Sequence, residues 1–153
     1  MTSPSKTLRA VTLVLRIALG VVFVYAAWTK LRMPWELFAM SIDSYQVLPL
    51  KVVELVARTL PWFELAVGLL LIAGYWLRGA AAATALLLAV FFGLMVRAYA
   101  KGMEINCGCF GTGDPISWKT LLRDGSMLAA ALALTVLSFL GRRKPEPDGA
   151  AGA

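Results

Sequence analysis

Four apolar runs, each about as long as a bilayer crossing, constrain this chain more than any other feature. In lipid, only helices and closed barrels satisfy every backbone polar group, and barrel strands would alternate polar with apolar residues, as these runs do not. The sequence therefore predicts an all-α fold, a polytopic membrane four-helix bundle. The predicted spans are Leu8–Trp28, Leu60–Leu77, Ala80–Ala98 and Leu121–Leu140.

Composition agrees with a membrane environment and excludes other classes. Hydrophobic residues make up 59% of the 153 residues and charged residues 16%, against roughly 25% charged in an average soluble domain. Four spans of about 20 residues each leave no room for a separate soluble domain. The net charge of +6 does not indicate nucleic acid, because Lys and Arg stand singly at the ends of apolar runs. We expect membrane lipid around the chain and no nucleic-acid partner.

The connection between the first two spans is amphipathic and is divided by prolines. Because proline is tolerated in the first helical turn, Pro34 and Pro49 are each predicted to open a short helix. Pro61 is predicted to kink the junction with the second span. This gives a short amphipathic helical segment between spans one and two.

Two further boundaries complete the predicted domain organisation. Leu77-Arg78-Gly79 is predicted to form a tight turn between spans two and three, with Gly79 interrupting the helix. Residues 1–141 are predicted to form one membrane domain. Residues 142–153 are rich in Pro, Gly and Ala, too poor in large apolar side chains to fold, and are predicted to be a disordered tail.

The distribution of basic residues gives the expected orientation. An even number of spans places both termini on one side. The termini side holds Lys6, Arg9, Arg16, Arg78, Arg142, Arg143 and Lys144, and the other side holds Lys30, Arg32, Lys51, Arg58, Arg97, Lys101, Lys119 and Arg123. The totals do not separate the two sides, but the first group lies in shorter segments close to span ends. We therefore expect the chain to lie in the cell membrane or inner membrane with cytoplasmic termini. The loop after the third span is then on the outer side of that membrane.

That outer loop contains the only two cysteines, in Asn106-Cys107-Gly108-Cys109-Phe110-Gly111. Disulfides form and persist in the compartment outside the membrane. A disulfide between residues two apart closes a small, strained ring, and strained disulfides are reduced more easily. Gly108 permits backbone angles that a side chain would forbid. These features favour a redox pair formed by Cys107 and Cys109, carried on a loop that includes Asn106, Gly108, Phe110 and Gly111.

Three other interpretations of the cysteines remain open. A structural disulfide this short would stabilise the fold little, because it closes almost no chain. A zinc site would need oxygen ligands such as Glu104 and Asp114, or a second subunit, because the chain has no histidine. Unpaired thiols are the third. The favoured interpretation includes no metal.

Five ionisable residues lie at similar depth near the outer ends of the spans. Charges inside apolar segments are costly and usually pair, reach the interface or serve a function. Lys30 and Glu64 are expected to form an ion pair, and Arg97, Arg123 and Asp124 are expected to join them in a polar layer beneath the cysteine loop. A cation there would favour the reactive thiolate. Arg16 lies toward the inner face, out of reach of Glu64, and is expected to extend to the headgroups.

The same residues carry a family resemblance. It rests on Tyr25-Ala26-Ala27-Trp28-Thr29-Lys30-Leu31, Tyr45-Gln46-Val47-Leu48-Pro49, Leu60-Pro61-Trp62-Phe63-Glu64-Leu65 with Gly68, and the cysteine motif. The chain resembles the MauE branch of the DoxX-like membrane proteins, named for methylamine utilisation. The resemblance implies disulfide chemistry in the cell envelope beside a thioredoxin-like partner, during maturation of a disulfide-rich dehydrogenase subunit. Carried over, Cys107 and Cys109 would be the redox pair, and Lys30 and Glu64 match family positions.

Two functional hypotheses follow. The first is a thiol-disulfide oxidoreductase or redox-relay component that exchanges disulfides with a thioredoxin-like protein or a disulfide-containing client. It requires no cofactor, although quinone is a candidate electron acceptor. The second is a non-catalytic accessory or assembly subunit of a larger respiratory or transport complex, because the alanine-rich third and fourth spans allow close packing against a partner.

Overall fold

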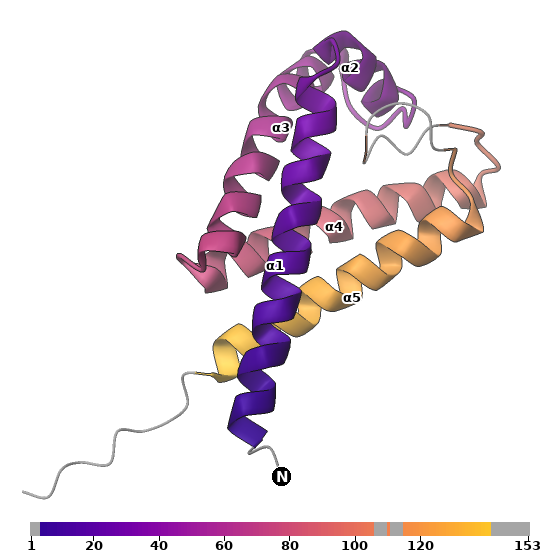
Figure 1. Ribbon diagram of the computed structural model, residues 1–153. Helices are drawn as coiled ribbons and strands as arrows, with labels where there is room; N and C mark the ends of the chain where they lie inside the picture. The colour runs from indigo at the N-terminus through magenta and orange to yellow at the C-terminus, as the bar shows by residue number, and fades with distance from the viewer. Residues whose placement is uncertain (1–3, 106–109, 111–114, 142–153) are drawn as a thin grey trace, which may run out of the picture.

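A computed structural model describes residues 4–105, 110 and 115–141 of the chain. Within these residues it contains five helices and no strand (Figure 1). They are α1 (Pro4–Leu31), α2 (Trp35–Asp43), α3 (Leu50–Ala73), α4 (Leu77–Ala100) and α5 (Trp118–Leu140). All except α2 are long and apolar enough to cross a membrane. The predicted all-α membrane fold is confirmed, and α2 is the short helix expected between the first two spans.

The spans α1 and α3 cross in close contact at two glycines, Gly20 and Gly68. A Cβ added to Gly68 would lie 3.0 Å from the carbonyl oxygen of Gly20 and 2.9 Å from Val24 Cγ2. A Cβ added to Gly20 would lie 2.6 Å from Ile72 Cγ1. Small residues at such a crossing bring the two backbones into direct van der Waals contact, which is a main source of helix association in membranes.

We expect Gly68→Ala to destabilise the protein by about 1 to 3 kcal/mol, the usual effect of adding a methyl group to a packed interior. Thermal unfolding of the detergent-solubilised protein measures this effect. Gly93→Ala is the matched control, because a Cβ at Gly93 meets nothing within 4 Å. Equal stability of the two variants would show that the α1–α3 crossing is looser than described.

The start of α3 differs from the prediction. Pro49 opens the long helix α3 itself rather than a separate short helix, and α3 continues through Pro61 to Ala73. Val53, Ala57 and Pro61 are buried at a spacing of four residues, on one face of the helix. Packing along this face keeps the segment helical across the proline, whose local effect alone would favour a break.

The turn between the second and third spans was also predicted at the wrong residues. It is formed by Gly74, Tyr75 and Trp76, while Leu77-Arg78-Gly79 is the first turn of α4. Gly74 has a φ of 74° and donates its backbone N–H to the carbonyl of Leu70 at 2.9 Å. Glycine adopts this left-handed conformation without a steric cost, so it ends the helix. The prediction failed because it treated the charge of Arg78 as the end of a span.

The remaining boundary predictions fall on the ends of the chain. The five helices of the described residues all fall within residues 1–141, and the assignment of that range to one membrane domain stays a prediction. The tail predicted for residues 142–153 lies outside the described residues, so its disorder stays a prediction.

Candidate functional site

The cysteine segment joins the end of α4 to the start of α5. Asn106, Cys107, Gly108, Cys109 and Gly111 lie outside the described residues. Around them, the backbone N–H of Ile116 donates to the carbonyl of Ile105 at 3.0 Å. The segment between these two residues therefore begins and ends at one place on the bundle.

Phe110 is the one residue of the cysteine motif whose placement the structure describes. Its ring lies 6.1 Å from the ring of Tyr25 in α1, centre to centre. The guanidinium carbon of Arg123 in α5 lies 4.7 Å from the centre of the same ring. Arg–aromatic contacts of this kind are attractive. The residue next to Cys109 is thus held between α1 and α5.

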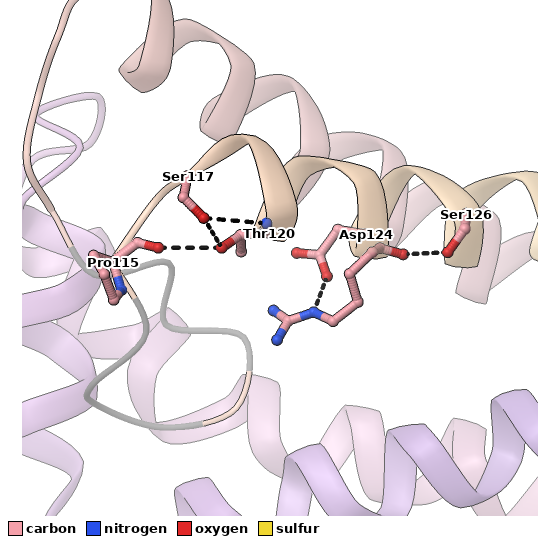
Figure 2. Close-up of polar contacts among 6 residues, drawn as sticks. Pro115, Ser117, Thr120, Asp124 and Ser126 are labelled. Carbon is pink, nitrogen blue, oxygen red and sulfur yellow. Dashed lines mark hydrogen bonds and ion pairs between the residues drawn. The ribbon is translucent and has the colours of Figure 1, made fainter.

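A hydrogen-bonded cap fixes the start of α5 (Figure 2). The Ser117 side chain accepts from the backbone N–H of Thr120 at 3.4 Å, and the Thr120 hydroxyl donates to the Pro115 carbonyl at 3.1 Å. Serine is a preferred residue at this position because it satisfies a free helical N–H. The cap sets the position of the first turns of α5, and with them Arg123 and Asp124.

Arg123 and Asp124 form an ion pair of which only one partner is buried. Arg123 Nε donates to Asp124 Oδ1 at 3.0 Å, with 38% of the arginine side chain exposed and 5% of the aspartate side chain. The expected proximity of these two residues to the cysteine motif is supported by the contact between Arg123 and Phe110.

Lys30 and Glu64 form the predicted ion pair, which is buried. Lys30 Nζ lies 2.8 Å from Glu64 Oε1 and 2.7 Å from Glu64 Oε2, with side-chain exposures of 1% and 7%. The ring of Phe38 in α2 lies 5.3 Å from the same ammonium nitrogen. The pair therefore joins α1 to α3 and lies against α2.

Arg97 does not pair with an acid in the described part of the chain. Its Nη1 donates to the backbone carbonyl of Tyr45 at 3.3 Å, which links the end of α4 to the residues after α2. The five residues predicted as one polar layer therefore divide into a buried pair, a half-buried pair and a cation bound to a carbonyl.

Glu64 and Asp124 line one cavity among α1, α3, α4 and α5. The rest of its lining is apolar and includes Phe91, Phe92 and Phe110. Its volume is about 30 Å³, which suits one or two water molecules. Sequence reasoning did not find this cavity, because the face that each span turns inward depends on packing between helices.

A second, apolar cavity lies between α2 and α4. Its volume is about 170 Å³, and Phe38, Ser41, Phe91 and Leu94 are among the residues that line it. Pockets that bind organic ligands usually start at about 300 Å³. The first cavity is therefore too small for an organic ring, whereas the second is below the usual size of a ligand pocket but large enough for one ring.

Comparison with known proteins places the chain in a family. Residues 8–137 match the family model described as methylamine utilisation protein MauE. The methylamine utilization protein MauE of Paracoccus denitrificans is 36% identical over 143 residues, which cover 90% of this chain and 75% of that protein. No solved structure matches the chain. The sequence match runs through α1, α3, α4 and the start and middle of α5, so the chain belongs to the MauE family of integral membrane proteins.

Proposed function

We propose that this protein is the membrane component of a thiol-disulfide relay in the cell envelope, with Cys107 and Cys109 as its redox pair. The observation that carries the proposal is the Cys-Gly-Cys motif, which contains the only two cysteines in the chain. The motif follows a membrane span and is joined through Phe110 to a cationic side chain. Membership of the MauE family points to methylamine utilisation as the setting of this relay, because that is the function named for its relative.

The exchange takes place between two thiols of one protein and a disulfide of the other. A thiolate of one protein attacks the disulfide of the other and forms a mixed disulfide. The second thiolate of the attacking protein then breaks this mixed disulfide and releases the partner with both of its cysteines reduced. The attacking protein gains a disulfide and loses two electrons, while its partner gains two thiols. The partner is a thioredoxin-like protein or a disulfide-containing client, for which we propose a protein of methylamine metabolism.

Arg123 has a supporting role in this proposal. Its guanidinium lies over the ring of Phe110, the residue that follows Cys109. A nearby cation favours the thiolate, which is the form that attacks disulfides. Asp124 holds Arg123 through the 3.0 Å bond to Nε, so both residues position charge beside the motif. The Lys30–Glu64 pair stabilises the same end of the bundle.

The proposed relay needs an electron acceptor, for which a second thiol protein is the primary choice. Quinone remains a candidate acceptor, and the apolar cavity of about 170 Å³ between α2 and α4 is large enough for one ring. The proposed exchange itself requires no quinone.

Labelling of the cysteines in intact cells tests the proposal and its orientation together. A membrane-impermeant maleimide with a large mass tag is added, with and without prior reduction, and the gel shift is measured. We expect full labelling after reduction and partial labelling before it, with the oxidised fraction changing when client expression is induced. Those results would place the motif outside and show that it cycles.

Two results would contradict the proposal in different ways. Labelling only after the membrane is broken would reverse the orientation. An oxidised fraction that stays constant whether or not client is present would favour the alternative, a non-catalytic subunit of a larger membrane complex. A Cys107→Ser/Cys109→Ser double variant is the control for background labelling.

A further inference from the structure

At the opposite end of the bundle, a large basic groove lies between the start of α1, the start of α4 and the end of α5. Its volume is about 1200 Å³. Four cationic side chains line it, and no Asp or Glu among the described residues does. These are Lys6, Arg9, Arg16 and Arg78.

Arg16 is the most informative of the four. Its Nε is buried and has no hydrogen-bond partner among the described residues. Its guanidinium packs against Gly74, so closely that a Cβ there would overlap Nη1. Gly74 thus leaves space for the guanidinium beside the α3–α4 turn. A half-buried charge without an acceptor is costly in an apolar environment, and an anion would remove that cost.

Arg78 is held at the side of the same groove, and no carboxylate in the described part of the chain pairs with it. Its Nε donates to the backbone carbonyl of Ser138 at 3.2 Å, and its guanidinium carbon lies 5.2 Å from the centre of the Phe139 ring. Both contacts come from α5, so the orientation of the group is fixed. A guanidinium group can donate two parallel hydrogen bonds to two oxygens of one phosphate group, because the two geometries match.

The walls of the groove are apolar. Leu8, Leu13, Leu77, Leu137 and Leu140 line it together with the cations. The helices that form it are candidate membrane spans. A ligand that fits has an anionic, phosphate-containing head and hydrocarbon chains, and it reaches the groove from within the bilayer.

We propose that this groove binds an anionic phospholipid, with its phosphate on Arg16 and Arg78 and its acyl chains along the leucines. Charge complementarity favours an anionic lipid over a zwitterionic one, because four cations and no acid of the described residues line the groove. The site lies at the other end of the bundle from the cysteine motif and does not depend on the proposed relay.

Thermal unfolding in a neutral detergent tests the site. Phosphatidylglycerol, phosphatidylcholine with the same acyl chains, and inorganic phosphate are each titrated into the purified protein. A ligand that binds only the folded state raises Tm with concentration. We expect phosphatidylglycerol to raise Tm and the other two to have little effect. Arg16→Gln should weaken the fitted affinity for phosphatidylglycerol by about tenfold, the effect of losing one charge-assisted contact.

Control variants make each outcome decisive. Lys51→Gln removes the same charge from an exposed position at the start of α3, at the far end of the bundle, and should keep the full shift. If Arg16→Gln does not fold, Arg9→Gln changes the exposed part of the groove and should still weaken binding. Equal shifts with phosphatidylcholine, equal losses in Lys51→Gln, or an undiminished shift in the groove variants would overturn the proposal. A phosphate-induced shift as large as that of phosphatidylglycerol would show a free-anion site instead of a lipid site.

Discussion

Glu64→Leu is expected to lower the free energy of unfolding by about 3 to 5 kcal/mol, because it leaves the Lys30 ammonium buried without its partner. The Lys30 side chain is 1% exposed, and its Nζ lies 2.7 and 2.8 Å from the two carboxylate oxygens of Glu64. Lys30→Met should cost a similar amount by isolating the carboxylate. The double variant should be much closer to the wild-type protein, because apolar side chains of similar volume can replace a buried pair almost neutrally.

A second ion pair in the same helix provides the control. Arg58 Nη2 lies 2.7 Å from Glu54 Oε1, but the two side chains are 55% and 49% exposed. Pairs of this kind contribute about 0 to 1 kcal/mol, so the same cycle at these positions should give small, nearly additive effects. Unfolding in mixed micelles measures both cycles. Additive losses at Lys30 and Glu64 would show that their contact contributes nothing to stability.

The Lys30–Glu64 pair also shows what the sequence alone could predict. Each residue of a helix adds about 1.5 Å of rise, so counting from the ends of apolar runs gives the depth of a charge. Depth was enough to pair Lys30 with Glu64, which lie on different helices. It was not enough for Arg97, whose depth is similar but whose side chain binds the Tyr45 carbonyl. Which face a residue occupies depends on helix packing, and a single sequence does not specify that.

The predictions of one turn and of one helix start failed for a related reason. Pro49 was expected to open a separate short helix, and Arg78 was expected to mark the end of a span. Pro49 instead precedes one continuous helix, α3, and Arg78 lies in the first turn of α4. The close approach of Gly20 to Gly68 and the cavity beside Phe110 are likewise products of packing.

Cys107→Ser and Cys109→Ser are each expected to abolish disulfide exchange, and one of them should accumulate a covalent complex. Exchange passes through a mixed disulfide that the second cysteine normally resolves, so removing the resolving thiol leaves the intermediate in place. Trapping should be strong for one variant and weak for the other, because one cysteine attacks the partner and the other resolves the mixed disulfide. Cys109 is the favoured resolving residue. Arg123→Gln should slow exchange without trapping, since both thiols remain.

The central claim is that the two cysteines exchange disulfides with another protein, and the most direct measurement is recovery of that mixed disulfide. Each serine variant is purified from acid-quenched membranes under non-reducing conditions, and crosslinked peptides are identified by mass spectrometry. We predict a disulfide between the remaining cysteine and a cysteine of a thioredoxin-like protein or client, lost on reduction and absent from the double variant. Full disulfide exchange in both serine variants, with no reducible adduct in either, would contradict the claim and leave the protein as a structural subunit.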